Sequence, residues 1–413
     1  MIKLLAALAL AALPPCPAAA GGFSAGGSLK TYLYSLEPAG IRNYPLPRPD
    51  GAYAVTENKF RLRTSWDGGA GLKAEGAYEL AFTGRQRELA KARPLSPGAG
   101  GNWRVSDLAL FLSPSSGGGA APAALAQNLD RAFITWSPAA FDFYAGRQAL
   151  AFGSARAVNP TDVLAPYPYG TIDSEERRGV DALRLKLPWR EMGELDAGWL
   201  PGRRWSADSG AGFLRGKRTL GLWDVTLLSA VFRGHLLAGA DLERRLGGAM
   251  LRLEAAQAWV GSFSDRSPKQ DFFRLSAGGE YLFSPLGGLD TWLEYHYNGA
   301  GAAGTGGYAS RAARAAYRDA NVYLLGRHYL SGGAGVRLSP LVSAGASLMV
   351  NLRDRSFYAL PSVEWNAASD LYLSVGALLP SGPGPVFSGA RIAASSEFGL
   401  YDKALYASAR LYF

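Results

Sequence analysis

The chain has 413 residues, of which 48% are hydrophobic and only 19% charged, and its formal net charge at pH 7 is +9. Plentiful apolar and aromatic residues exclude an intrinsically disordered chain. One cysteine and three histidines exclude a disulfide-stapled scaffold and a Cys/His zinc protein. Beyond the first 20 residues, no apolar run approaches the length of about 18 residues that a membrane-spanning helix needs. Two classes remain, a large exported β protein and an ordinary globular enzyme.

Residues 1–20 have the pattern of a secretory signal peptide. Lys3 supplies a positive charge, an apolar stretch follows, and small residues end in three alanines, which predicts cleavage before Gly21. A lipoprotein signal at Cys16 is the alternative, but two prolines directly precede this cysteine, where lipidation signals have small residues. Because the signal contains the only cysteine, the remaining chain cannot form wrong disulfides in an oxidising compartment.

Most of the remaining chain alternates between apolar and polar residues, which indicates half-buried strands. Between residues 72 and 82, Leu72, Tyr78 and Phe82 lie on one face, and Lys73 and Glu79 lie on the other. The same period occurs, in chain order, at 59–66, 183–187, 273–283, 342–351, 371–379 and 405–413.

A soluble β sandwich would show the same alternation, but three features favour a membrane. The predicted strands are long for soluble sheets. Aromatic residues stand near strand ends, where an interfacial girdle would place them: Trp66, Phe82, Trp136, Trp199, Phe283, Tyr297 and Trp365. The chain also ends in an alternating strand with Leu411 and Phe413, which resembles the C-terminal assembly signal of bacterial outer-membrane barrels. We therefore predict an all-β fold, a transmembrane antiparallel up-and-down β-barrel.

A spanning β structure must close on itself, because hydrocarbon leaves no partner for an unpaired backbone group. The chain length predicts about 16 strands, with a range of about 14–18. No linker or charge block divides the sequence, so residues 21–413 are expected to form a single barrel domain. Long irregular stretches occur at 38–52, 84–102, 113–126, 149–178 and 299–319. The stretches at 113–126 and 149–178 fall on opposite sides of the membrane in this scheme, a conflict that the sequence leaves open.

The most individual stretch of the sequence runs from 146 to 180. It contains Gly146-Arg147-Gln148, then Phe152-Gly153, then Asn159-Pro160-Thr161-Asp162. Together with the later Asn351–Ser356 segment, these motifs resemble the porin-like outer-membrane β-barrel family of Gram-negative bacteria, from about residue 130 to the end. The resemblance implies a channel for small solutes or an oligosaccharide exporter. It carries over no catalytic residue and does not fix the substrate.

A loop that enters a barrel needs charged and amide side chains to satisfy its backbone. The stretch 149–178 and its flank supply such side chains, so we predict that it folds into the lumen and narrows it. The candidate constriction residues are Arg147, Gln148, Arg156, Asn159 and Asp162. The alternative is a surface loop with local caps.

Basic residues dominate the polar face of several predicted strands. The candidate lumen-facing charges are Arg61, Arg63, Lys73, Arg184, Lys186, Arg252 and Arg274. Such a wall would favour anionic solutes in a narrow aqueous channel. In the alternative interpretation, the arginines and the glutamates between them brace the wall and neutralise one another.

The sequence favours an outer-membrane channel for passive or weakly selective passage of small, in particular anionic, solutes. The alternatives are a structural or adhesion barrel with an occluded lumen and an exporter of an anionic polysaccharide. None of His235, His296 and His328 lies in a catalytic motif, so no enzyme, cofactor or metal site is predicted, and His296 is expected in the aromatic girdle. The expected partners are the lipid bilayer, lipopolysaccharide, the outer-membrane barrel assembly machinery and small solutes. Dispersed basic residues argue against nucleic acid, and the oligomeric state stays open.

Overall fold

The computed structural model describes residues 22–45, 51–86, 89, 103–108, 122–264, 270–284, 288–389 and 391–413, so the predicted signal peptide lies outside it. Alternating residues form long strands. The first half contains β1 (Phe23–Glu37), β2 (Tyr53–Gly69), β3 (Leu72–Arg85), β4 (Ala123–Trp136), β5 (Asp142–Gln148), β6 (Val180–Pro188), β7 (Gly193–Leu200), β8 (Ala211–Leu220) and β9 (Trp223–Phe232). The second half contains β10 (His235–Leu246), β11 (Ala249–Trp259), β12 (Phe272–Phe283), β13 (Leu289–Asn298), β14 (His328–Ser339), β15 (Val342–Asn351), β16 (Phe357–Ala368), β17 (Leu371–Ser381) and β20 (Lys403–Tyr412).

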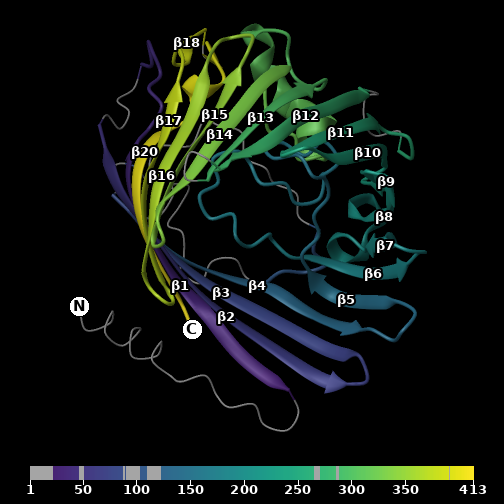
Figure 1. Ribbon diagram of the computed structural model, residues 1–413. Helices are drawn as coiled ribbons and strands as arrows, with labels where there is room; N and C mark the ends of the chain where they lie inside the picture. Colours follow the sequence, from purple (N-terminus) through teal and green to yellow (C-terminus); the bar gives the residue numbers. More distant parts are fainter. Residues whose placement is uncertain are drawn as a thin grey trace.

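These strands form one closed sheet of 18 strands (Figure 1). Each strand pairs antiparallel with its neighbours along the chain, and β20 pairs with both β17 and β1. The backbone of Phe413 continues the closing seam, because Gly27 N–H donates to its carbonyl at 2.7 Å and its own N–H donates to Gly27 at 3.1 Å. The prediction of an all-β, closed antiparallel barrel is confirmed, with a strand count at the upper end of the predicted range.

The connections differ in length at the two ends of the barrel. Short turns at 70–71, 221–222, 247–248, 340–341 and 369–370 lie at one end, where β1 begins and β20 ends. Long connections lie at the other end. One of them carries the small hairpin of β18 (Val386–Ser388) and β19 (Arg391–Ala393), followed by η6 (Phe398–Leu400), and another carries η5 (Thr305–Ala313) and α2 (Ala315–Arg318). The short helices η2 (Arg203–Trp205) and η3 (Ala207–Ser209) follow β7 at this end.

The predicted conflict between two loops disappears in the structure. The strands β3 and β4 pair directly with each other, so everything between Arg85 and Ala123 is one connection. Most residues of the stretches predicted at 84–102 and 113–126 lie outside the described residues, and 123–126 already belong to β4; the β3–β4 connection lies at the same end of the barrel as the β5–β6 connection. Residues 103–108, the described part in the middle of this connection, have no regular secondary structure.

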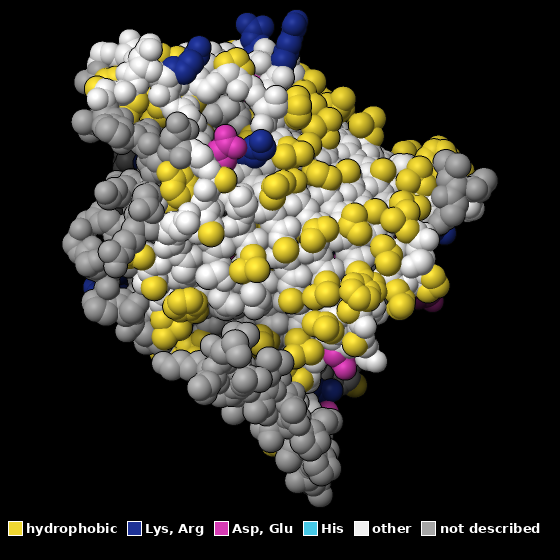
Figure 2. All heavy atoms as spheres, turned by 90° about the vertical axis from the view of Figure 1, so that its left-hand side faces the viewer, with side chains coloured by type: hydrophobic (Ala, Val, Ile, Leu, Met, Phe, Trp, Pro, Cys, Tyr) yellow, Lys and Arg dark blue, Asp and Glu magenta, His cyan; other side chains and the backbone are white. Residues whose placement is uncertain are grey.

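The outer face of the barrel is apolar. Outward-facing side chains such as Leu33, Leu227, Leu293, Val375 and Leu405 are largely exposed, although each is large and hydrophobic. On the face shown in Figure 2, hydrophobic side chains spread across the wall, and charged side chains gather near its upper and lower edges. An apolar surface of this extent is stable only when a nonpolar medium or a partner covers it.

Aromatic residues stand on the outer face at both ends of the strands. Trp66, Trp136, Phe283 and Trp365 lie toward the short-turn end, and Phe82, Trp199 and Tyr297 lie toward the other end. This arrangement matches the two girdles of a membrane barrel. None of the helices in the described part of the chain is long and apolar enough to cross a bilayer.

Candidate functional site

The β5–β6 connection, residues 149–179, lies inside the ring of strands (Figure 1). We call it the inner loop. Its backbone follows no regular secondary structure, so its buried peptide groups need partners from the barrel wall. Three sets of contacts provide them: an apolar cluster, two glutamates on the strand wall, and a group of ion pairs.

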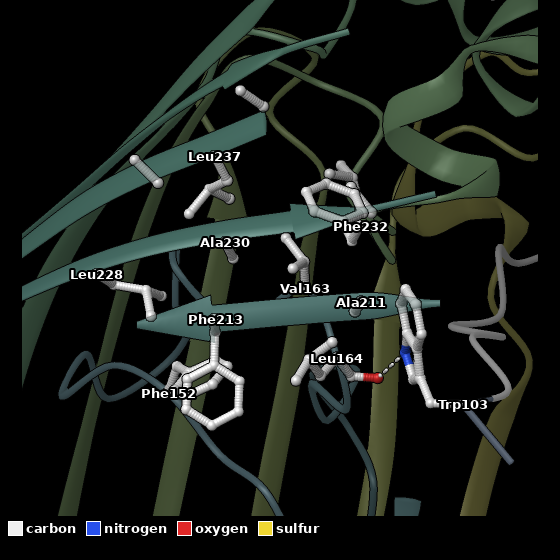
Figure 3. Close-up of a cluster of buried hydrophobic side chains, with 14 of the residues drawn as sticks. Trp103, Phe152, Val163, Leu164, Ala211, Phe213, Leu228, Ala230, Phe232 and Leu237 are labelled. Carbon is white, nitrogen blue, oxygen red and sulfur yellow. Dashed lines mark hydrogen bonds between the residues drawn. The ribbon is translucent and has the colours of Figure 1, made fainter. Parts of the chain in front are cut away.

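The first part of the inner loop packs on the inward face of β8, β9 and β10. Phe152 lies against Phe213 with ring centroids 4.9 Å apart in an edge-to-face arrangement. Val163 and Leu164 pack in the same buried cluster, and Trp103 from the β3–β4 connection closes it by donating from its indole N–H to the Leu164 carbonyl at 2.8 Å (Figure 3). Apolar burial thus fixes this part of the loop to one side of the lumen.

Glu254 on β11 binds the next part of the loop from the wall. Its carboxylate is 0% exposed and accepts hydrogen bonds from the backbone N–H groups of Ser154 and Ala155, both at 3.1 Å. It also accepts from the N–H and hydroxyl of Thr161 at 2.8 and 2.6 Å. Gly153 has a φ of +87°, and a Cβ there would lie 2.5 Å from the Glu254 carboxylate, so the glycine of the Phe-Gly step is required by this approach.

Glu294 on β13 repeats this arrangement one step further along the loop. Its carboxylate accepts from the N–H groups of Arg156 at 2.6 Å, Ala157 at 3.2 Å and Val158 at 3.1 Å. Ser276 on β12 donates its hydroxyl proton to the Val158 carbonyl at 2.6 Å. The backbone N–H groups of residues 154–158 and 161 are therefore satisfied by inward-facing carboxylates of β11 and β13.

The Asn159–Asp162 segment forms the predicted turn. The Asp162 N–H donates to the Asn159 carbonyl at 3.3 Å, and the fully buried Asp162 carboxylate accepts from the N–H groups of Leu164 and Ala165 at 3.2 and 3.1 Å. Burial raises the pKa of Asp162, although the Arg177 guanidinium and the two N–H groups oppose this shift. Asp162 therefore stabilises the turn from inside the loop and does not face the lumen.

The last part of the inner loop is held by ion pairs on the other side of the barrel. Asp173 pairs with Lys30 on β1 at 2.9 Å and with Lys59 on β2 at 3.1 Å. Glu175 pairs with Lys30 at 2.8 Å and with Arg410 on β20. Burial would raise the pKa of Asp173, but the two ammonium groups outweigh it and hold the pKa below its ordinary value.

Glu176 extends this group of ion pairs onto β2 and β4. It pairs with Arg61 at 3.4 Å, with Arg131 at 3.7 Å and with Arg63. Arg61 also pairs at 2.8 Å with the buried Asp130, which is the extra residue of a β-bulge in β4. The strands β1, β2 and β20 lie five to nine strands around the 18-stranded ring from β11 and β13, so the two sets of contacts hold the inner loop at well-separated sides of the lumen.

The five candidate constriction residues have different environments. Arg147 is buried and binds Asp181 at 2.7 Å and Asp107 at 3.3 Å, and the buried Gln148 donates to the Ala182 carbonyl at 3.2 Å. These two residues, like Asp162, brace the backbone, whereas the buried Asn159 Oδ1 has no hydrogen-bond partner among the described residues and only the Asn159 carbonyl takes part in the turn. Arg156 alone among the five has an exposed guanidinium, which lies 3.1 Å from Glu280 and 3.4 Å from Asp290.

All seven candidate lumen-facing cations have partners. Arg61, Arg63, Arg184, Lys186 and Arg252 pair with Asp130, Glu176, Asp196, Glu194 and Glu280 in that order, Arg274 donates to the Pro160 carbonyl, and Lys73 pairs with Asp67 near the short-turn end. These contacts favour the alternative in which the charges brace the wall. Two open cavities have charged side chains in their lining, and the first of them includes two of these cations. One of about 310 Å³ is lined by Arg61, Arg63, Arg131, Glu75 and Glu176, and one of about 650 Å³ by Arg337, Asp290 and Glu364.

The three histidines have structural environments. His296 faces the interior, is buried and lies 2.8 Å from the Ser276 hydroxyl, so its expected place in the girdle was wrong. His328 has that environment instead: the Tyr295 hydroxyl lies 2.7 Å from its Nδ1, and Tyr297 lies beside it. His235 lies 3.3 Å from Asp319. The described residues contain no group of His, Cys, Asp and Glu side chains arranged to hold a metal ion.

A second buried network joins the loops at the long-connection end. The Glu397 carboxylate, just before η6, accepts from the N–H of Leu325 at 2.8 Å, from Asn351 at 2.7 Å and from the Tyr329 hydroxyl. Asp354 accepts from the Glu397 N–H at 2.8 Å. Burial raises the pKa of Glu397 to about 7 against these donors. The Asn351–Ser356 motif thus fastens the β17–β20 connection onto the β13–β14 connection.

The sequence did not single out several residues that hold the inner loop. Glu254, Glu294, Lys30 and Lys59 are not among the candidate site residues. One sequence feature could have pointed to the two glutamates: each is a charged residue on the inward face in the middle of a strand, far from the aromatic strand ends. The carboxylates at 173, 175 and 176 lie within the 146–180 stretch, but their partners come from β1, β2, β4 and β20, which no local pattern connects with them.

Comparisons with known proteins identify the fold. No protein-family model and no curated protein matches the chain. The solved structure of OccD3 (OpdP) of Pseudomonas aeruginosa is similar, with a TM-score of 0.52 and 12% identity over 98% of this chain and 96% of that one. OccK9 (OpdG) of P. aeruginosa and OccAB4 of Acinetobacter baumannii both have a TM-score of 0.56, with 11% and 8% identity over 95% of this chain and 98% of theirs. The chain therefore has the closed barrel fold of these proteins along almost its whole length.

Proposed function

We propose that this protein is an outer-membrane channel for passive or weakly selective passage of small solutes, and that the inner loop narrows its lumen. The barrel has an apolar outer face with aromatic residues at both ends and a charged inner face. Its structural neighbours are Occ/OprD outer-membrane channels for small solutes. An outer-membrane location also accounts for the signal peptide predicted at residues 1–20, with lipopolysaccharide, the bilayer and the barrel assembly machinery as partners.

The observation that carries the proposal is the double attachment of the inner loop. Residues 154–161 bind Glu254 and Glu294 on one side, and residues 173–176 bind lysines and arginines of β1, β2 and β20 on the other. A segment held at well-separated walls crosses the lumen and reduces the cross-section that a solute can use. Arg156 is the predicted constriction residue whose charge reaches the solvent.

Conductance in a planar bilayer tests the proposal. The wild-type protein is expected to form a channel of small conductance, and a variant in which residues 155–175 are replaced by a short Gly-Ser linker is expected to conduct several times more. The linker keeps the strand connection, so far-ultraviolet circular dichroism should show the same β content in both proteins. Equal conductance of the two proteins would remove the narrowing role of the loop.

Selectivity is expected to be weak, with a mild preference for anions. The paired charges neutralise one another along most of the wall, but three arginines and two glutamates line the cavity of about 310 Å³ beside Glu176. Arg63 is the most exposed of the three arginines. Reversal potentials in a salt gradient measure this preference, and clear cation selectivity would contradict it.

A barrel with an occluded lumen is the second candidate. Loop residues build buried apolar clusters inside the long-connection end, one around Phe152 and Leu164 and another around Val158, Tyr323 and Phe398. Such packing would suit a structural or adhesion barrel whose external loops bind a partner. Absence of conductance in the folded wild-type protein would favour this candidate. A loop across the lumen argues against an exporter of a polysaccharide chain, which needs a wide passage.

A further inference from the structure

Two arginines stand on the outer face near the short-turn end. On β8 and β10 the inward face is formed by residues such as Phe213 and Leu237, which are buried in the interior cluster. Arg218 comes five residues after Phe213 on β8, and Arg244 comes seven residues after Leu237 on β10. Because successive side chains of a strand point to opposite faces, both arginines point outward. The register supports this, because Arg244 is directly opposite the exposed Trp223 of β9.

Each guanidinium lies over an indole ring. The Arg218 Cζ is 5.7 Å from the ring centre of Trp189 in the β6–β7 turn, and the Arg244 Cζ is 5.1 Å from that of Trp223. A cation over an indole face is a favourable contact, but it leaves the N–H donors of the guanidinium unused. The two pairs occur on neighbouring strands and at the same end of the barrel.

Neither arginine has an anionic partner among the described residues. The ion pairs found there include most arginines of the inner wall, but not Arg218 or Arg244. The Nε–H groups of both side chains are buried and find no hydrogen-bond acceptor among the described protein atoms. Two guanidinium groups without an ion-pair partner among the described residues therefore lie on the outer face.

The surroundings of this pair are apolar. Leu220, Leu222 and Leu246 are 51%, 70% and 56% exposed, and Met192 in the β6–β7 turn is 77% exposed. In a membrane barrel, such side chains reach the hydrocarbon, and indoles mark the level of the headgroups. A guanidinium is costly at the middle of the bilayer but not at its interface, where its aliphatic stem covers apolar surface and its charge reaches the phosphates.

We propose that Arg218 and Arg244, together with Trp189 and Trp223, form a binding site for the phosphodiester of an anionic phospholipid in the leaflet at the short-turn end. The guanidinium matches a phosphate with two parallel N–H donors, and two unpaired cations favour a lipid that carries net negative charge. The indoles hold the guanidinium planes and contact the upper acyl chain. The site requires that the barrel lies in a membrane, but not that it conducts.

The test compares two double variants that remove the same charge from opposite faces of the same strands. Arg218→Ala/Arg244→Ala removes the outward pair, and Lys217→Ala/Arg245→Ala removes the inward neighbours. Purified proteins in micelles with equal amounts of phosphatidylglycerol and phosphatidylethanolamine are examined by native mass spectrometry. The wild type and the inward variant are expected to retain phosphatidylglycerol, and the outward variant to retain it at least tenfold less.

Three outcomes are decisive. Equal retention by both double variants overturns the site, and so does equal retention of the two lipids by the wild type. Displacement of the lipid by inorganic phosphate at the same concentration also overturns it, because the acyl chains and indoles would then contribute nothing. If the outward double variant does not fold, the single variants Arg218→Ala and Arg244→Ala decide, each with a partial loss. Conductance is measured on the same samples, so failure of the lipid site and failure of the channel proposal are distinguished.

Discussion

The substitution Glu254→Gln tests how firmly the inner loop is held. Each carboxylate oxygen of Glu254 accepts two hydrogen bonds. One oxygen accepts from the N–H groups of Ser154 and Ala155, and the other accepts from the N–H and hydroxyl of Thr161. A glutamine has only one acceptor oxygen, so its amide group must face one of these pairs of donors. In either orientation two hydrogen bonds to the side chain are weakened or lost.

The magnitude follows from these contacts. A hydrogen bond to a charged group contributes about 1.5–3 kcal/mol, so the loss of two such bonds costs about 3 kcal/mol at the lower limit. Since about 1.4 kcal/mol corresponds to a factor of ten, the population with a released loop rises roughly a hundredfold. We expect the variant to show frequent transitions to a higher conductance in single-channel recordings, where the wild type shows a steady low level.

Glu194→Gln is the matched control, because Glu194 also lies on the strand wall but pairs with Lys186 on the neighbouring strand. It is expected to behave as the wild type. Thr161→Val removes only the hydroxyl bond and should give a smaller effect, which keeps the test informative if the glutamine variant folds poorly. Identical recordings from Glu254→Gln and Glu194→Gln would refute the attachment of the loop through Glu254.

Three further substitutions test other contacts that hold the loops inside the barrel. Gly153→Ala places a methyl group against the Glu254 carboxylate at a positive φ, so it should raise conductance nearly as much as loss of the carboxylate; wild-type currents would contradict this. Asp173→Asn removes one of the two carboxylate partners of Lys30 and of Lys59, while Glu175 and Glu57 stay in place; it should cost about 1.5–3 kcal/mol and expose the loop to limited proteolysis that the wild type resists. The pKa of Glu397 is raised from its ordinary value of 4.5 to about 7 in the folded protein. Between these two pH values the folded protein binds more protons than the unfolded chain. The free energy of unfolding therefore falls as the pH rises through this window, by about 3 kcal/mol at most. Thermal unfolding in detergent should therefore separate wild type from Glu397→Gln at pH 8 but not at pH 5, and parallel curves would contradict it.

The barrel was predictable because its cause is repeated along the whole chain. Every strand must present an apolar face to the outside, so the period of two at 72–82 or 371–379 appears without any knowledge of distant contacts. The strand count was harder, because short strands such as β5 and β7 leave little alternation to read. Residues 103–108 show another limit: these described residues have no regular secondary structure, and only the direct pairing of β3 with β4 shows that they lie within one connection.

The site was predictable only where its chemistry is local. The turn at Asn159–Asp162 is formed by hydrogen bonds between residues close in the sequence, and its Asn, Pro and Asp residues are typical of turns. The alternation also predicts which residues of β11 and β13 face inward. It does not predict whether the Glu254 carboxylate contacts water, an arginine or a backbone N–H. That choice depends on a loop about a hundred residues away in the chain.

The same reasoning explains why the arginines of the inner wall are poor predictors of selectivity. A cation on the inward face attracts anions only when no carboxylate of the protein lies closer, and the inner loop brings Asp173, Glu175 and Glu176 to the basic side of the lumen. Selectivity and loop position are thus coupled: as long as the loop is attached, its carboxylates neutralise the wall. When the loop is removed, the lysines and arginines of β1, β2 and β20 face water. Replacement of residues 155–175 should therefore shift the reversal potential toward anions as well as raise the conductance, and an unchanged reversal potential would show that these ion pairs do not set the field in the lumen.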